Sequence, residues 1–291
     1  MAALSSMSRT VLVSTLAGTI LACLPAVAGA QQRPLVTEDP ETIGAGRLLL
    51  ETGIDYGRGV EYPVSGLTGQ LLRVPLVGVS IGISSIAELQ FDGGFYNRLT
   101  ITERDPAAPL ANLVTATGDS TSSVEDLVVA TKVRVLGETE ARPAFGLRLA
   151  TKLPNASNES GIGLDTTDFL ASLLVGKTVR SVRTVINGGF GILGDPVVAN
   201  RQTDVVTYGV SLARALTQAA EVVGEINGYF DTRDHTPERP GTTHGTLRLG
   251  ARYTVGGWRG DVATVIGLTS RDPGIGFAAG FTYVFTAFQI P

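Results

Sequence analysis

Hydrophobic and polar side chains alternate along most of the chain, and residues 142–177 show the pattern in its simplest form. Phe145, Leu147 and Leu149 fall on one face of an extended segment, and Arg148 falls on the other. A polar segment rich in Asn, Ser and Gly follows, which is typical of a turn, and a second apolar run returns from it. The stretch therefore predicts a β-hairpin with a polar tip.

The same unit recurs from residue 47 to residue 285 and predicts about twelve strands. Most of them place apolar side chains on one face and polar or charged side chains on the other, as in a sheet with two unlike surroundings. Within the second strand, Pro75 lacks an N–H for the ladder, so we expect a bulge near it. The predicted strands span residues 47–56, 70–83, 86–95, 125–136, 142–152, 168–177, 183–193, 204–213, 221–230, 245–255, 258–268 and 275–285.

Long and short connections alternate between these strands. The long ones are predicted at 57–69, 97–123, 154–165, 194–203, 231–244 and 269–274, and the short ones at 84–85, 137–141, 178–182, 214–219 and 256–257. Outer-membrane barrels have long external loops and short periplasmic turns, whereas a soluble sandwich has no reason for this regularity. The sequence therefore predicts an all-β fold, a transmembrane antiparallel up-and-down β-barrel of about 12 strands in the outer membrane of a Gram-negative-type bacterium.

The first thirty residues predict a secretory signal peptide. Arg9 is the only charge there, an apolar run follows from Val11 to Leu24, and Ala28-Gly29-Ala30 fits a cleavage site. The lone cysteine, Cys23, leaves a second interpretation open, in which the chain is cleaved before Cys23 and lipidated. We accordingly expect a signal peptide at 1–30, an extended polar leader at 31–46 and the barrel at 47–291.

Composition excludes some classes of partner. The net charge is −4, and charged residues make up 17% of the chain without forming a basic stripe, which argues against nucleic acid. Removal of the signal peptide leaves no cysteine, so neither a disulfide framework nor thiol chemistry is expected. Membrane lipid, the barrel-assembly machinery and an unidentified small solute are the partners that the pattern predicts.

Charges of both signs occur on the polar faces of the predicted strands. In a lipid-embedded barrel the polar face is the lumen, so these side chains are candidates for lining it. They either select solutes along a polar conduit or pair with one another and plug the lumen, and the sequence leaves both open. The candidates are Glu88, Asp126, Lys132, Arg134, Arg148, Lys152, Glu221, Glu225, Arg248, Arg252 and Asp261.

Aromatic side chains gather on the apolar faces and at strand ends. Their positions predict lipid-facing girdles, in preference to a stacking track for a ligand. Trp258 lies beside the predicted turn at 256–257, where an interfacial anchor is expected.

Signals for catalysis or a cofactor are weak. His235 and His244 share one predicted loop with acidic residues, but their spacing matches no common metal motif, so a hydrophilic external loop is the preferred interpretation. Ser157 and Ser160 have no base nearby in the sequence. Gly161-Ile-Gly163 lacks the third glycine of a dinucleotide fingerprint. We therefore predict no enzyme activity, no metal and no cofactor.

The central hairpin carries a resemblance to a known family. Its runs Lys152-Leu-Pro154, Ser160-Gly-Ile-Gly-Leu-Asp165 and Asp168-Phe-Leu resemble those of a broad family of bacterial outer-membrane proteins, described as transporters or as related to the meta-pathway of phenol degradation. Glu51, Glu88 and Glu225 loosely match glutamates that the family carries on early and late strands. One departure is that the chain continues past Phe288, whereas outer-membrane barrels commonly end on an aromatic residue.

The resemblance implies uptake or efflux of small molecules, with aromatic and hydrophobic ones as candidates. The leading hypothesis is an outer-membrane barrel that passes or binds small solutes. The alternative is a non-conducting structural or surface-interaction barrel whose extracellular loops bind a partner, and an outer-membrane hydrolase ranks third.

Overall fold

The computed structural model describes residues 33–232 and 243–289, and within them almost all regular structure is β-strand. Two short 3₁₀ helices lie in loops, η1 at Ala111–Leu113 and η2 at Asn158–Ser160. The strands are β1 (Arg47–Tyr62), β2 (Leu67–Gly82), β3 (Ala87–Gly94), β4 (Asn97–Arg104), β5 (Ser120–Ser123), β6 (Val128–Leu136), β7 (Ala144–Lys152), β8 (Asp168–Val179), β9 (Val182–Gly194), β10 (Gln202–Ala215), β11 (Ala220–Asp231), β12 (His244–Val255), β13 (Trp258–Gly267) and β14 (Ile275–Thr286).

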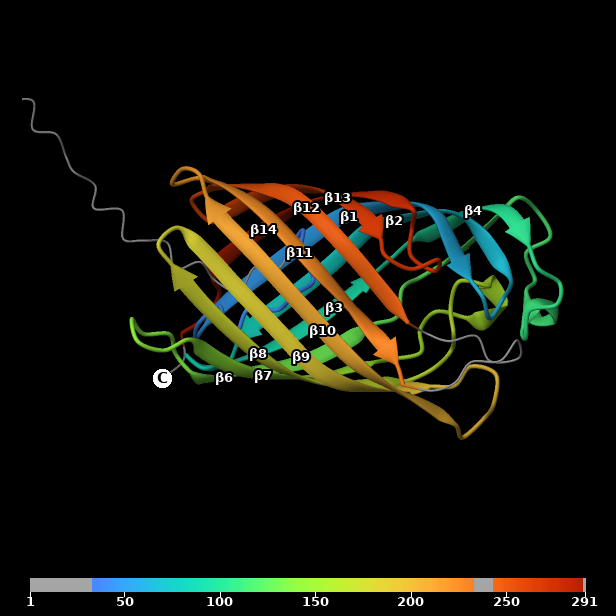
Figure 1. The fold of residues 1–291 in the computed structure, drawn as a ribbon, viewed down its shortest axis with the longest axis horizontal. Helices are drawn as coiled ribbons and strands as arrows, with labels where there is room; N and C mark the ends of the chain where they lie inside the picture. The colour runs from blue at the N-terminus through green and yellow to red at the C-terminus, as the bar shows by residue number, and fades with distance from the viewer. Residues whose placement is uncertain (1–32, 233–242, 290–291) are drawn as a thin grey trace, which may run out of the picture.

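These strand segments form one closed antiparallel barrel (Figure 1). β1 pairs with β14 on one side and with β2 on the other, which closes the sheet. β3 and β4 pair with successive parts of β2, while β6 and β5 pair with β3 and β4 respectively. β3 and β4 together thus fill one strand position in the wall, and β5 and β6 together fill another. The 14 strand segments therefore make the 12-stranded barrel that the sequence predicts.

Alternation of burial along each strand shows which surface faces outward. On β13, Val262 is 47% exposed, whereas its neighbours Asp261 and Ala263 are 5% and 3% exposed. An apolar outer face and a charged inner face suit a barrel surrounded by lipid, because exposing the apolar outer face to water would be unfavourable. The described part of the chain contains no helix long and apolar enough to cross a membrane.

The two ends of the barrel differ in their connections. Short turns, the start of β1 and the end of β14 lie at one end, and the longer connections lie at the other, as Figure 1 shows. By the usual arrangement the first end is periplasmic and the second is external. The prediction of alternating long and short connections holds, except at two places.

The loop predicted at 57–69 is wrong. β1 runs on to Tyr62 and β2 begins at Leu67, so only four residues join them. Most of the glycines that indicated a loop are strand residues here, and only Gly66 lies in the turn, with φ +76°. Gly57 pairs with Leu71, and a side chain on Gly69 would collide with the carbonyl oxygen of Thr100 on β4. Close packing of neighbouring strands, and not a turn, therefore explains Gly69.

The long gap predicted at 97–123 is also partly wrong. β4 and β5 lie within it, and the loop between them covers only residues 105–119. The polar sequence of β4 hid the strand, although Leu99 is fully buried where β4 packs against its neighbours. The expected bulge near Pro75 is present, because the register between β1 and β2 shifts between Gly53 and Asp55, opposite this proline.

An aromatic cluster marks the periplasmic rim. The ring of Trp258 stacks on Tyr283 with ring centroids 3.8 Å apart and lies 4.7 Å from Phe281. Tyr283 in turn stacks on Phe285 at 5.2 Å. Rings beside the turn at 256–257 suit the boundary between lipid and water, where aromatic side chains are favoured.

Candidate functional site

The leader that precedes β1 lies inside the barrel. Pro34, Pro40 and Ile43 are almost completely buried, and Leu35 and Glu38 are nearly so. The sequence predicted an extended polar leader, and the structure places its residues 33–46 against the inner wall, where they contact strands on every side. The barrel and its own leader therefore form one polar site, which runs from the middle of the barrel towards its periplasmic end.

The first described residue of the leader is held at the seam between β1 and β14. Arg33 Nη2 donates a hydrogen bond to the carbonyl oxygen of Ala279 at 2.9 Å and lies 3.6 Å from Asp55 Oδ1. The register places Gly53 directly opposite Gly280 at this seam. A Cβ on either glycine would collide with the Arg33 guanidinium, so the two glycines make room for it.

Side chains of the wall next form hydrogen bonds with the backbone of the leader. The Glu225 carboxylate accepts hydrogen bonds from the N–H of Val36 at 2.8 Å and from the N–H of Thr37 at 2.8 Å. Arg248 Nη1 donates to the carbonyl oxygen of Pro34 at 3.1 Å, and Arg252 Nε donates to that of Arg33 at 2.8 Å. Charged side chains thus satisfy backbone groups that would otherwise be buried without partners.

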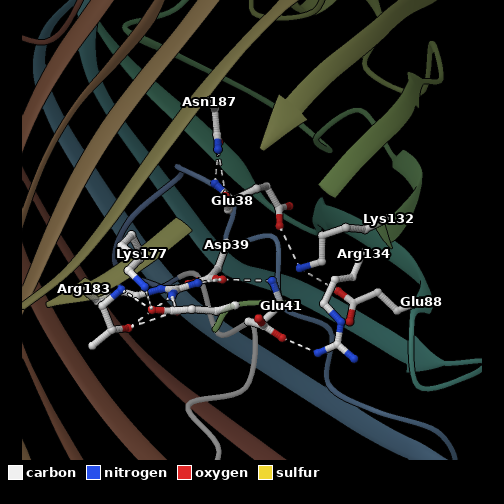
Figure 2. A network of polar contacts seen from close by, with 11 residues as sticks. Glu38, Asp39, Glu41, Glu88, Lys132, Arg134, Lys177, Arg183 and Asn187 are labelled. Atoms are coloured by element: carbon white, nitrogen blue, oxygen red, sulfur yellow. Dashed lines mark hydrogen bonds and ion pairs between the residues drawn. The ribbon is translucent and has the colours of Figure 1, made fainter. Parts of the chain in front are cut away.

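Glu38 is the centre of the network. Its N–H donates to Asn187 Oδ1 at 2.7 Å, and Asn187 Nδ2 donates back to the Glu38 carbonyl oxygen at 2.8 Å (Figure 2). The Glu38 carboxylate lies 3.3 Å from Lys132 Nζ and 2.9 Å from Arg148 Nε. Lys132 is fully buried and also lies 2.9 Å from Glu88 Oε1. A buried ammonium between two carboxylates is stable only while those partners remain.

Two further leader carboxylates meet arginines nearer the periplasmic end. Asp39 accepts two hydrogen bonds from Arg183, at 2.8 and 2.6 Å, in the bidentate arrangement that suits a guanidinium. Glu41 pairs with Arg134, whose Nη2 also donates to the carbonyl oxygen of Ser85 at 2.9 Å. Figure 2 shows these pairs beside one another. The acidic part of the leader thus faces a basic part of the wall.

The last leader contacts join it to β1. The N–H of Ile43 donates to Glu88 Oε2 at 2.7 Å, and the Ile43 side chain packs with Leu49 and Val284. This apolar cluster fixes the point where the leader turns into the wall. Movement of the leader would therefore involve residues before Ile43 more readily than Ile43 itself.

Most predicted lumen candidates surround the leader. Three do not, namely Asp126, Lys152 and Glu221. Asp126 and Lys152 contact each other at 3.1 Å in the external half of the barrel. Glu221 lies near Arg259, 4.0 Å from its guanidinium. The candidates grouped around the leader are Glu88, Lys132, Arg134, Arg148, Glu225, Arg248, Arg252 and Asp261.

The sequence interpretation missed the charged leader residues of the network, and on the wall it missed Asp55, Gln90, Arg183 and Asn187. The Gln90 amide donates to Glu38 Oε2 at 3.3 Å and accepts from Arg148 Nε at 2.8 Å. The leader itself carried the available signal, because three acidic residues lie within four positions in a chain whose predicted lumen face contains many bases. Opposite charge suggests proximity, yet nothing in the alternation of the strands indicates that the segment before them folds inward.

A cavity of about 560 Å³ occupies the external half of the barrel. Tyr62, Leu71, Leu110, Ile162 and Leu164 give it apolar walls. The described chain also contributes six carboxylates and three bases, which are Glu61, Glu125, Asp126, Asp168, Asp195 and Asp231, with Arg73, Lys152 and Arg271. None of leader residues 33–46 lines this cavity, so the described leader and the cavity occupy successive parts of the barrel.

External loops fold over the cavity and hold one another. Ser65 Oγ donates to the carbonyl oxygen of Gly161 at 2.5 Å, and Thr121 Oγ1 donates to that of Ser160 at 2.7 Å. Asp126 Oδ1 accepts from the N–H groups of Asn155 and Ala156 at 2.9 and 2.7 Å. The hairpin tip predicted at 154–165 is thus an external loop with defined contacts.

A buried aspartate anchors the loop between β13 and β14. Asp272 accepts hydrogen bonds from the N–H of Gly245 at 2.9 Å and from Thr269 Oγ1 at 2.6 Å, and lies 3.0 Å from His244 Nδ1. Burial alone would raise the pKa of Asp272, but the hydrogen bonds from His244, Thr269 and Gly245 outweigh it and lower the pKa below its usual range.

We expect this anchor to be lost in acid and by substitution. Because the pKa of Asp272 is lowered by folding, its contribution is complete above the pKa of an unfolded aspartate, about 4, and disappears as pH falls through the lower value in the folded protein. D272N should make the bond after Arg271 readily cleavable by trypsin at neutral pH. D119N, in another external loop, is the matched control, and equal cleavage of both variants would contradict the anchor.

Within the described residues, no cluster of three or more His, Cys, Asp and Glu side chains could hold a metal ion. His235, which shares a predicted loop with His244, lies outside the described residues. His244 contacts Asp272 and packs edge-on against Tyr229, with ring centroids 5.2 Å apart.

The closed wall, the outward apolar face and the charged interior define a transmembrane β-barrel of the outer-membrane class. No protein-family model and no curated protein sequence matches the chain. Among solved structures, the chain is similar to the COG4313 outer membrane channel from Pseudomonas putida F1, with a TM-score of 0.62, 13% identity, and coverage of 85% of this chain and 98% of that one. This similarity supports the fold.

Two further solved structures are more distant. The translocator domain of the autotransporter NalP from Neisseria meningitidis has a TM-score of 0.47 and 16% identity, over 83% of this chain and 89% of that one. A mutant of the TodX monoaromatic hydrocarbon channel has a TM-score of 0.40 and 11% identity, over 86% of this chain and 93% of that one.

Proposed function

We propose that the protein is an outer-membrane conduit for small solutes whose periplasmic half is occupied by its own leader, so that passage requires the leader to move. Aromatic and hydrophobic molecules are the candidate solutes. The observation that carries the proposal is the order of parts along the barrel. An external cavity with apolar walls and polar groups is followed by a segment held only by non-covalent contacts, in a lumen lined with charge.

The contacts of the leader suit a removable segment. Before Ile43 its polar contacts are mainly ion pairs and hydrogen bonds that involve side chains, whereas the strands of the wall are joined by continuous backbone ladders. A polar wall can be rehydrated when the leader leaves, because water replaces each lost hydrogen bond. The comparisons support the fold of the proposed conduit, and the similar protein from Pseudomonas putida is an outer membrane channel.

The second function is a barrel that stays closed and whose external loops bind a partner. The number of contacts that hold the leader favours this closed barrel, since Glu38 alone contacts Lys132, Arg148 and Asn187. Under this alternative the leader is a permanent part of the core.

Planar-bilayer recording of the refolded mature protein separates the two. The conduit should show intermittent current, because the leader closes the lumen most of the time, and R148Q should lengthen the open periods by removing one partner of Glu38. A protein that folds, inserts and shows no current at any voltage, with or without R148Q, would exclude the conduit.

A further inference from the structure

We propose that the external cavity is a binding site for a small organic cation, an amine on an apolar body. This inference deepens the proposed function, on which it rests, because it names the class of solute that the conduit would accept.

The charges at the floor of the cavity are unbalanced. Lys152 Nζ is shared by two carboxylates, Asp126 at 3.1 Å and Asp168 at 2.9 Å. Arg73 is likewise shared, between Glu125 at 3.1 Å and Asp55 at 3.0 Å. Arg33 also lies 3.6 Å from Asp55, so three bases serve these four carboxylates. Among the described residues the cavity is lined by six carboxylates, three bases and His244, and Asp195 also pairs at 3.8 Å with Arg201, which is not in the lining.

Two acceptor atoms beside this floor have no donor within the described chain. Asn97 lines the cavity and is 91% buried, and its Oδ1 has no hydrogen-bond partner. Glu125 Oε2 is likewise buried without a partner, although Oε1 of the same carboxylate pairs with Arg73. The register places Asn97 opposite Arg73, which brings both acceptors to one side of the cavity. A buried acceptor without a donor is costly, so a donor supplied by a ligand would be favoured.

An ammonium group matches both features. Its N–H groups can donate to Asn97 Oδ1 and Glu125 Oε2, and its charge offsets the excess of carboxylate. The apolar walls, which include Leu71 and Ile162, suit the remainder of the molecule. The cavity volume of about 560 Å³ is in the range of small-molecule sites.

Calorimetric titration of the mature full-length protein in detergent, with three probes of equal length, tests the proposal. These are 4-phenylbutylamine, 4-phenylbutanol and 4-phenylbutanoate, whose terminal groups are a cation, a neutral hydroxyl and an anion on a similar apolar body. We expect the amine to bind at least about tenfold more tightly than the alcohol, since hydrogen bonds to charged groups are roughly twice as strong as neutral ones. The carboxylate should bind most weakly, and added salt should weaken binding of the amine.

Variants at the two acceptors sharpen the test. E125Q should weaken binding of the amine about tenfold or more, and N97D should tighten it by adding a charge where the unpartnered oxygen lies. D119N changes an exposed acid outside the cavity and should have no effect. Each variant is first checked for folding by its heat-modifiable migration on a gel.

The outcomes separate this inference from the proposed conduit. Absence of amine binding, or equal affinity for the alcohol or the carboxylate, would overturn the cation site whatever the currents show. Amine binding that responds to E125Q and N97D would support the cation site even in a barrel that never conducts.

Discussion

Neutralising the three leader acids in the full mature chain, E38Q/D39N/E41Q, should increase the open fraction of the barrel at least about tenfold. The variant removes the charge of every leader carboxylate that pairs with the wall, namely those facing Lys132, Arg148, Arg183 and Arg134. Each pair is partly or fully shielded from water, so its loss weakens docking more than the loss of an exposed pair would. The bases keep other neighbours, because Glu88 remains beside Lys132.

Single-channel recording in planar bilayers measures this effect as the fraction of time spent open. The matched control is E103Q/D105N/D119N, which neutralises three exposed acids at external positions and should leave the open fraction unchanged. An open fraction equal to that of the wild type, in a triple variant that migrates as a folded barrel, would show that these ion pairs do not hold the leader.

The second large effect is expected on stability. K132M should lower the free energy of unfolding by about 3–5 kcal/mol, because it leaves Glu38 and Glu88 buried together without the cation between them. Lys132 is fully buried, so solvent cannot replace the lost partner. The triple variant K132M/E38Q/E88Q should recover much of the loss, since it removes the stranded charges as well.

Urea unfolding of the refolded protein, followed by the heat-modifiable gel shift, measures both variants. A control at Lys177, which lies at the rim and is partly exposed, should cost less as K177M, because water can replace its contacts with Glu138 and with the turn carbonyls. A loss for K132M no larger than that for K177M would contradict the role assigned to the buried network.

The wall was largely predictable from the sequence because the barrel imposes a two-residue period. Each strand must present one face to lipid and one to the interior, so Leu249 and Arg252 reveal their faces without reference to any other strand. The errors at 57–69 and 97–123 arose where glycine or polar residues satisfied packing between strands that are distant in sequence, such as Gly69 beside Thr100.

The site was less predictable because its pairings depend on how segments that are distant in sequence pack together. The candidate residues Lys132 and Glu225 were identified by alternation, but their partners Glu38 and Val36 lie in the leader, which has no periodic pattern. Register between strands fixes which residues of the wall are neighbours, whereas the path of a segment across the interior is set by many weak contacts at once. The cavity, likewise, depends on how external loops such as 154–165 fold back.

If solutes pass only when the leader moves, a disulfide that fixes the leader to the wall should close the barrel. A Cβ on Gly209 of β10 would lie 3.0 Å from Thr37 Oγ1 and 3.4 Å from Thr37 Cγ2, close to the spacing that a disulfide requires. The Thr37 hydroxyl has no hydrogen-bond partner within the described chain, so cysteine removes no such contact there. The chain's one cysteine, Cys23, lies in the predicted signal peptide.

The measurement is the bilayer current of T37C/G209C before and after reduction, with thiol labelling to show that the disulfide has formed and the two single-cysteine variants as controls. The oxidised protein should conduct no current, and reduction should restore current to the level of the single variants. Current that persists unchanged in the fully oxidised protein would contradict gating by the leader, because solutes would then pass beside a leader that cannot leave.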